Sequence, residues 1–253
     1  MRFASLGSGS RGNATLIESG SSRLLLDCGF AARETERRLN LLGVAPETLD
    51  AILVTHEHQD HVRGVGPMAR RYKLPVWLTY GTHRKDRCGE LPDPHLFHSH
   101  QGDFQIGDIL VTPYPVPHDA SEPVQFVFNA GSRQLGVLTD TGMVTPHIVE
   151  VLSTSDSLLL ECNHDAAMLS SGPYPLSLQR RVGGNYGHMS NRQSAGLLGQ
   201  LDHARLNNLV AAHLSEKNNR PELARQALLE VAPDIESRFS LTSQDCVSEW
   251  FDV

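Results

Sequence analysis

The sequence predicts a single domain of mixed α/β structure that spans residues 1–253, and three observations support this prediction. The chain has 253 residues, which is enough for one large hydrophobic core. Short apolar runs of strand length recur along it, each bounded by Gly, Pro, Asp or His. Segments with helical spacing of apolar residues lie between these runs. No linker, repeat or low-complexity tract divides the chain.

Strands are expected at the apolar runs, which are too short for ordinary helices and end at residues that interrupt regular structure. The runs are Ala14–Ile17, Arg23–Leu26, Ala51–Val54, Val76–Leu78, Ile109–Val111, Gln125–Phe128, Leu135–Leu138, Leu158–Leu160 and Leu209–Ala211. Two stretches without such a pattern, Pro92–His100 and Gly172–Gly187, are expected to form long surface loops. Loops of that length in a compact domain are often functional.

Helices are expected in four segments, whose ends are marked by residues that start or stop helices. The segments are Arg33–Leu42, His61–Lys73, Ser190–Leu201 and Pro221–Val231. Gly43 provides a C-terminal stop for the first segment, and Pro75 lies just beyond the second. Ser190 or Asn191 is a candidate N-cap for the third. The fourth has a proline in its first turn and Pro233 beyond its end.

Composition and charge limit the possible classes of protein. Hydrophobic residues make up 40% of the chain and charged residues 20%, which is typical of a globular protein. The net charge of −7 argues against a surface rich in basic residues for general nucleic-acid binding, but it permits a local basic patch. The sequence has no apolar stretch of signal-peptide or membrane-span length. The four cysteines have no paired spacing, so we expect free thiols and a cytoplasmic location.

The strongest chemical signal comes directly after the apolar run Ala51–Val54. The next seven residues read THEHQDH and contain the potential metal ligands His56, His58, Asp60 and His61. Neither a helix face nor a strand face requires three histidines and an aspartate so close together. Imidazole nitrogens and carboxylate oxygens are the ligands that zinc prefers outside thiolate sites. The segment therefore predicts a metal site at the end of a strand.

Three further candidate ligands stand directly after later apolar segments. These residues are His118, Asp140 and His213. Each of them alone is explained equally well as a turn residue. Their repetition at strand ends is the pattern that loops converging on one site would produce.

The pattern H-x-H-x-D-H, followed by a distant His, Asp and His, resembles that of the metallo-β-lactamase superfamily over nearly the whole chain. The resemblance implies a four-layer αββα sandwich with two divalent metal ions, zinc or alternatively manganese or iron, at one edge of its sheets. It implies that one ion is held by His56, His58 and His118, that the other is held by Asp60, His61 and His213, and that Asp140 bridges them. Asp27 matches an aspartate that supports the metal loop by hydrogen bonds.

The implied pair of metal ions supplies hydrolytic chemistry. Two dications about 3.5–4 Å apart lower the pKa of a bridging water, so that a hydroxide nucleophile exists near neutral pH. Asp60 is a catalytic candidate as well as a ligand, because its carboxylate can orient that hydroxide. This chemistry suits phosphodiesters, thioesters, lactones and lactams, so the metal site alone does not name the substrate.

Other segments narrow the choice of substrate, because they closely resemble the YycJ/WalJ group of bacterial proteins of this fold. They are SGSRGNA at residues 8–14, ECNHD at 161–165, YGHMSN at 186–191 and AHLSEKNN at 212–219. The group is regarded as DNA-directed, with 5′-to-3′ exonuclease activity. The resemblance therefore implies phosphodiester hydrolysis by a nuclease.

Several residues are candidates for contact with a phosphodiester substrate. His188 is the second catalytic candidate, because it could hydrogen-bond a phosphate oxygen or protonate the leaving group. Asn13 lies in a Gly/Ser-rich turn that could present backbone N–H groups to an anion. His164, Arg180 and Arg181 complete the set. The arginines, like the basic residues between positions 70 and 87, are equally well explained as a solvated surface.

Two other functions remain open at this point. The acidic net charge favours a small-molecule phosphodiesterase acting on cyclic nucleotides or cyclic sugar phosphates. A catalytically silent scaffold is disfavoured, because all the ligand positions are retained. Cys88, His95, His98 and His100 are of the right types for a further structural metal ion. No motif indicates a membrane contact or an oligomeric state.

Overall fold

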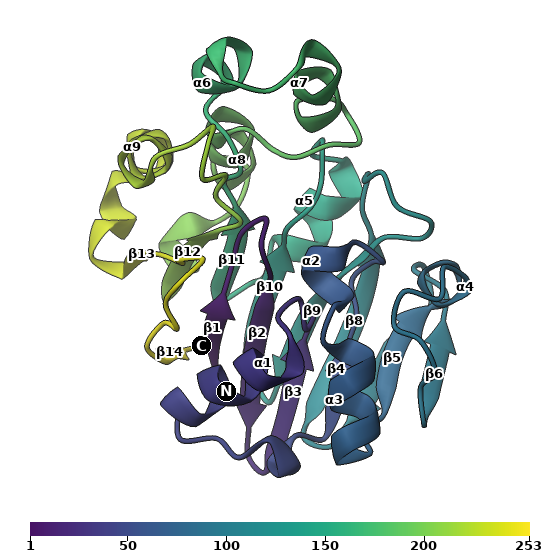
Figure 1. Ribbon diagram of the computed structural model, residues 1–253. Coiled ribbons are helices and arrows are strands. Elements are labelled where there is room, and N and C mark those ends of the chain that lie inside the picture. Colours follow the sequence, from purple (N-terminus) through teal and green to yellow (C-terminus); the bar gives the residue numbers. More distant parts are fainter.

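The first sheet comes mainly from the N-terminal part of the chain (Figure 1). The computed structural model describes residues 1–253. The strands lie in the order β14 (Phe251–Asp252), β1 (Arg2–Gly7), β2 (Ala14–Ser19), β3 (Ser22–Leu26), β4 (Ala51–Leu53), β5 (Val76–Thr79) and β6 (Pro94–Phe97). Pairing is antiparallel from β14 to β3 and parallel from β3 to β6. The carboxyl ends of β3, β4 and β5 therefore share one edge of the sheet.

The second sheet follows the first in the chain and also has seven strands. Their order is β13 (Phe239–Leu241), β12 (Asn208–Ala212), β11 (Ser157–Glu161), β10 (Arg133–Leu138), β9 (Val124–Ala130), β8 (Ile109–Pro115) and β7 (Phe104–Ile106). Strands β10 to β13 are parallel, and β7 to β10 are antiparallel. The loops after β10, β11 and β12 thus leave the sheet at one edge.

Helices cover the outer face of each sheet. They are α1 (Ala32–Leu41), α2 (Gln59–Val62), α3 (Val65–Tyr72), α4 (Tyr80–Arg84), α5 (Pro146–Leu152), α6 (Ala166–Ser171), α7 (Leu176–Val182), α8 (Asn191–Leu198) and α9 (Pro221–Val231), with 3₁₀ turns at Pro46–Thr48, His203–Arg205 and Pro233–Arg238. Helices α1 and α3 pack on the first sheet, and α5, α8 and α9 pack on the second. The expected four-layer αββα sandwich is confirmed. None of the helices combines the length and the hydrophobicity of a membrane span.

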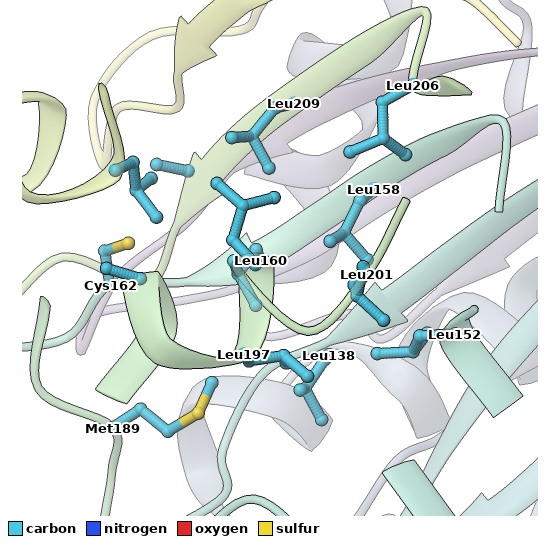
Figure 2. Close-up of a cluster of buried hydrophobic side chains, with 14 of the residues drawn as sticks. Leu138, Leu152, Leu158, Leu160, Cys162, Met189, Leu197, Leu201, Leu206 and Leu209 are labelled. Carbon is cyan, nitrogen blue, oxygen red and sulfur yellow. The ribbon is translucent and has the colours of Figure 1, made fainter. Parts of the chain in front are cut away.

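Three apolar clusters fill the spaces between the four layers. Strand β11 contributes side chains to two of these clusters, because successive residues of a strand point to opposite faces of the sheet. Leu158 and Leu160 pack against the helices, together with Leu197 of α8, whereas Leu159 belongs to the cluster between the sheets. Figure 2 shows Leu158 and Leu160 beside Leu209 of the neighbouring strand. Burial on both faces explains why such strands are continuously apolar in sequence.

Most of the expected elements are present, and three expectations were wrong. Each of the apolar runs contributes to a strand, and α9 has the expected bounds. The segment His61–Lys73 forms two helices instead of one, because the Gly64 N–H leaves the helical pattern and donates to the carbonyl of Cys28 at 2.7 Å. The two expected loops contain strand β6 and helix α7. Strand β6 is at a sheet edge and α7 buries no residue, so neither has a strong apolar period.

Candidate metal centre

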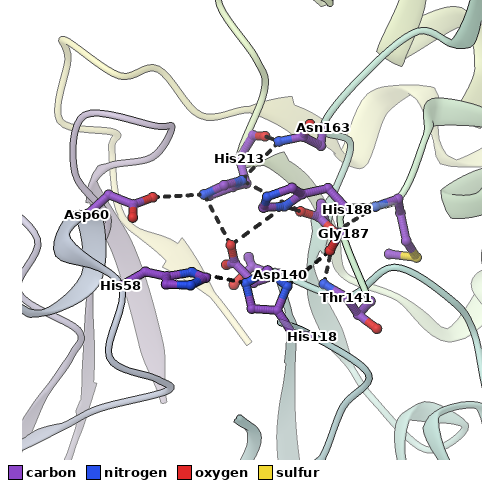
Figure 3. Close-up of polar contacts among 12 residues, drawn as sticks. His58, Asp60, His118, Asp140, Thr141, Asn163, Gly187, His188 and His213 are labelled. Carbon is purple, nitrogen blue, oxygen red and sulfur yellow. Dashed lines mark hydrogen bonds and ion pairs between the residues drawn. The ribbon is translucent and has the colours of Figure 1, made fainter. Parts of the chain in front are cut away.

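Loops after five strands bring the candidate ligands together at one edge of the sandwich. The histidine-rich segment follows β4, His118 follows β8, Asp140 follows β10, and His213 follows β12. Glu161 is the last residue of β11. Figure 3 shows that side chains from these separate loops point toward a common centre. The parallel arrangement of β10, β11 and β12 explains why residues far apart in sequence meet there.

Three residues at these strand ends have left-handed backbone conformations. The φ angles are 57° at Asp27, 52° at Asp140 and 57° at His213. Such conformations cost a residue other than glycine about 1–3 kcal/mol and persist where surrounding structure enforces them. Their presence at three strand ends of one site indicates that the fold holds these side chains in a set direction.

The first donor group consists of three histidines. The ligand atoms of His56, His58 and His118 all lie within 4.8 Å of one another. His58 Nδ1 is 2.9 Å from His56 Nε2 and 3.2 Å from His118 Nε2. The remaining ring nitrogens point outward, His56 Nδ1 to Thr55 Oγ1 at 3.0 Å and His118 Nδ1 to the carbonyl oxygen of Gly187 at 3.0 Å. Because that carbonyl accepts only, His118 Nδ1 carries the proton and Nε2 of the neutral ring presents a lone pair.

The second donor group contains Asp60, His61 and His213. Asp60 Oδ2 lies 3.5 Å from His61 Nε2 and 3.6 Å from His213 Nε2. Asp140 lies between the two groups, because it forms one donor cluster with His56 and His61 and another with His213. Its Oδ2 is 3.4 Å from His61 Nε2, and its Oδ1 is 3.4 Å from His213 Nε2. This position suits a carboxylate that contacts two cations.

A divalent cation fits these donors better than hydrogen bonds do. Asp140 Oδ2 and His213 Nε2 are buried and have no hydrogen-bond partner. Three histidine nitrogens that face one another cannot all be satisfied by sharing protons, whereas a cation accepts a lone pair from each. Nitrogen and carboxylate oxygen donors suit zinc, manganese or iron. A divalent metal centre is therefore the role that the geometry supports, as the fold family implies.

The two donor groups differ in their electrostatics. Burial lowers the pKa of His56 and His118, so these rings stay neutral at neutral pH. Burial also opposes charge on His213, but the neighbouring Asp140 and Asp60 carboxylates outweigh it and raise the pKa of His213 to about 9. The pKa of His61 is raised well above its usual value by Asp140 and Asp60 against the same opposition. The first group is thus neutral, and the second is rich in carboxylate.

Further residues fix the ligands by hydrogen bonds. Asp27 Oδ2 accepts from His61 Nδ1 at 2.8 Å, which leaves Nε2 of that ring directed into the site. The other Asp27 oxygen accepts from the Thr55 backbone N–H at 2.9 Å. Across the site, the Asn163 amide is 3.2 Å from His213 Nδ1 and donates to the His213 carbonyl oxygen at 3.0 Å. Asp27 therefore has the contacts expected from the sequence, and Asn163 supplies a counterpart that the sequence analysis did not include.

His188 forms a pair with Glu161, a residue that the sequence analysis did not assign to the site. His188 Nδ1 lies 2.8 Å from Glu161 Oε1. The buried carboxylate of Glu161 also accepts from the backbone N–H groups of Met189 at 3.0 Å and Thr141 at 3.3 Å. The His188 ring stacks on His213 at a centroid distance of 5.2 Å. Glu161 follows the apolar run Leu158–Leu160 directly, so the strand-end pattern that indicated Asp140 and His213 would have found it.

The expected substrate residues occupy three different environments. The Asn13 side chain is buried and contacts His61 Nε2 at 3.1 Å and Asp60 Oδ2 at 3.3 Å, so it lies among the metal ligands. Arg181 pairs with Asp119, Nε to Oδ2 at 2.5 Å, and Asp119 Oδ1 is 3.5 Å from His118 Nε2. His164 and Arg180 line a separate cavity beside the centre.

The four residues considered for a further metal ion do not form a donor cluster. His95 stacks on Trp77 at 4.5 Å, and His98 Nδ1 contacts Glu122 Oε1 at 3.1 Å. Among the nearby basic residues, Arg71 pairs with Glu36 at 2.9 Å and Arg70 donates to the Glu90 carbonyl oxygen at 2.6 Å. His95 and His98 therefore have structural partners outside the metal centre.

Comparison with known proteins agrees with this geometry. The fold matches that of the metallo-β-lactamase fold protein YhfI from Bacillus subtilis with a TM-score of 0.76, over 98% of this chain and 99% of that one, at 18% sequence identity. Residues 22–213 match the sequence profile of the β-lactamase superfamily domain.

This chain belongs to the metallo-β-lactamase superfamily. Two relatives in this superfamily match almost the whole chain. Exodeoxyribonuclease YycJ of Bacillus anthracis is 35% identical over 234 residues, which cover 91% of this chain and 89% of the relative. Exodeoxyribonuclease WalJ of Streptococcus pneumoniae is 32% identical over 90% of this chain and 87% of the relative. The resemblance to the YycJ/WalJ group expected from the sequence is confirmed.

Proposed function

We propose that this protein is a metal-dependent phosphodiester hydrolase that acts as an exodeoxyribonuclease, with 5′-to-3′ polarity and with nucleic acid as its substrate. The observation that carries the proposal is the bridging position of Asp140 between two donor groups, in a chain that matches two exodeoxyribonucleases over about nine-tenths of its length. Phosphodiester cleavage places charge on both the attacked phosphate and the leaving oxygen, and a two-cation centre is suited to stabilise both.

The proposed ligand scheme follows the two donor groups. His56, His58 and His118 would hold one divalent ion and Asp60, His61 and His213 the other, with Asp140 between them. Zinc is the proposed native metal, and manganese and iron are the alternatives. When bound, the ions activate water near neutral pH and stabilise negative charge on oxygen. The Asp60 carboxylate, at 3.3 Å from the Asn13 amide, is held where it can also orient the attacking water.

His188 is the proposed proton donor and the group that binds the phosphate. The Glu161 carboxylate accepts from His188 Nδ1, which fixes the orientation of the ring. No hydrogen bond engages His188 Nε2, so that side of the ring is free to donate to a non-bridging oxygen or to the leaving oxygen. The stack on His213 keeps the ring beside the metal ligands.

A cytoplasmic location is part of the proposal. The four cysteines Cys28, Cys88, Cys162 and Cys246 are all free thiols. Free thiols are typical of proteins from reducing compartments such as the cytoplasm.

The acidic net charge of −7 favours one competing function, hydrolysis of a small cyclic phosphodiester. A cleavage assay separates the two. Zinc- or manganese-loaded protein is incubated with end-labelled single- and double-stranded DNA and RNA, with a 2′,3′-cyclic nucleotide and with bis(p-nitrophenyl) phosphate. Release of mononucleotides from DNA ends, at higher kcat/KM than for the cyclic nucleotide, is the expected result. Turnover of the small diesters without degradation of any oligonucleotide would contradict the nuclease assignment.

A further inference from the structure

A second cavity lies beside the metal centre, under the short helices α6 and α7. Figure 1 shows these two helices beyond the end of the second sheet, with α8 next to them. The cavity has a volume of about 350 Å³ and is lined by residues of α6, α7 and the start of α8. This volume is within the range of small-molecule sites. None of the lining residues is acidic.

His164 is the buried polar group of this cavity. It is 3% exposed, and neither of its ring nitrogens makes a hydrogen bond. Nδ1 is fully buried, and Nε2 lies 4.0 Å from the point that a Cβ would occupy at Gly183, which also lines the cavity. Most buried polar groups in proteins have a hydrogen-bond partner, so a buried histidine that has none is unusual. A ligand with an acceptor oxygen in the cavity would give Nε2 a partner.

Arg180 supplies a positive charge at the same cavity. Its side chain is exposed and forms no ion pair, unlike that of its neighbour Arg181, which is bound to Asp119. The N-cap Ser190 and the third residue Gln193 of helix α8 also line the cavity, and because their N–H groups bond to each other's side chains, α8 contributes only the positive potential of its N-terminus. A helix N-terminus favours anions. A buried donor, a free guanidinium and a helix N-terminus together are features of an anion site.

We propose that the cavity formed by His164, Arg180 and the start of α8 binds the phosphate monoester of a nucleotide. The inference rests on the proposed nuclease function, which supplies two sources of this group: the terminal phosphate of the strand being degraded and the free mononucleotide. The position of the cavity fits either source. The backbone N–H of His188 donates to the carbonyl oxygen of Val182 at 2.8 Å, which connects the loop that carries His188 to helix α7 in the cavity wall. The site selects phosphorylated ends or retains the product next to the catalytic histidine.

The first test compares oligonucleotide ends. The metal-loaded protein is given single-stranded DNA with a 5′-phosphate, with a 3′-phosphate or with two hydroxyl ends, and kcat/KM is measured for each. The expected preference for one phosphorylated end is about 10- to 100-fold, as for hydrogen bonds to a charged group. Arg180→Gln and His164→Leu should bring this ratio toward one. Arg192→Gln is the matched control, since Arg192 is an exposed arginine of α8 outside the cavity and should keep the ratio.

The second test measures binding of dAMP and of inorganic phosphate by calorimetry to the same four proteins. Weaker dAMP binding by Arg180→Gln than by Arg192→Gln, without any end preference in the unaltered protein, would assign the cavity to the free nucleotide. The inference is overturned if the unaltered protein shows neither an end preference nor binding that depends on Arg180, or if both arginine variants change equally. Degradation of DNA with those negative results would leave the proposed function intact. Binding of dAMP through Arg180 by a protein that degrades no DNA would contradict the proposed function alone.

Discussion

The two halves of the metal centre are built in different ways. The N-terminal half supplies its ligands from one continuous segment, in which His56, His58, Asp60 and His61 lie within six residues after β4. The C-terminal half supplies one residue from each of several strand ends, as in His118, Asp140 and His213. The first half is encoded by a local motif. The second depends on the ends of β8, β10 and β12 lying at the same edge of the second sheet, so a change of register in that sheet would separate its ligands and leave the first half intact.

Removal of Asp140 should have the largest effect, because this carboxylate lies between the two donor groups. Asp140→Ala is expected to lower the metal content from about two ions per chain to fewer than one and to reduce hydrolysis to background. Elemental analysis after gel filtration and the bis(p-nitrophenyl) phosphate assay measure both effects. Asp140→Asn is the control for backbone strain, because asparagine tolerates the left-handed conformation. Near-native metal content in the alanine variant would mean that the two donor groups bind metal independently of Asp140.

Loss of Asp60 should distinguish the two donor groups. Asp60→Ala removes a carboxylate of the second donor group but leaves the three-histidine group complete. We expect loss of turnover with about one metal ion retained per chain, again by elemental analysis. A variant that keeps full activity would show that Asp60 is neither a ligand nor an orienting group.

Removal of His188 tests the proposed proton donor, which comes from the C-terminal half of the centre and has no counterpart in the N-terminal half. His188→Ala should lower kcat for phosphodiesters by about 10²–10³-fold at unchanged metal content, because it removes a donor to the developing charge. Glu161→Gln should lower kcat in the same assay by a smaller factor, since it weakens the hydrogen bond that orients the His188 ring. Loss of metal from the His188 variant would make it a ligand. An unaltered rate would make it a bystander.

Supporting residues on the two sides should have smaller and similar effects. Asp27→Asn weakens the hydrogen bond that orients His61, and Asn163→Ala removes the amide beside His213. Each is expected to lower metal affinity by about 10- to 100-fold, measured by competition with a chelating dye. A loss confined to Asp27→Asn would show that strand topology alone holds His213 in place.

The smallest expected effect concerns thiol reactivity, which compares the packing around the two sheets. Burial raises the pKa of Cys28, in the first half, and of Cys162, in the second, to about 12. A raised pKa keeps each thiol protonated as the pH rises from 7 to 9, so neither should become more reactive in that range. Titration with an aromatic disulfide should modify exposed Cys246 rapidly in the folded protein and all four thiols after denaturation. Rapid modification of Cys162 alone would reveal local opening of the C-terminal half.

The fold and the ligands were predictable to different extents, for physical reasons. The apolar runs identified their strands because burial on both faces leaves a continuous signal, as at Leu158–Leu160. Helix α7 was missed because it buries no residue and therefore has no apolar period. Within the site, the segment after β4 is conspicuous in sequence, and Glu161 stands at a strand end like Asp140, but the contact of Asn163 with His213 is revealed only by the folded chain.

At the three left-handed residues of the strand ends, backbone stability and the chemistry of the site favour different side chains. Glycine adopts such conformations freely, so selection for heat resistance alone would place it at Asp27, Asp140 and His213. A glycine at Asp140 or His213 has no atom that could bind a metal ion, and a glycine at Asp27 loses the hydrogen bonds to His61 and Thr55, so each such change relieves backbone strain at the expense of the site. Laboratory evolution for higher melting temperature, carried out without an activity screen, should therefore accumulate losses of function at these three positions first.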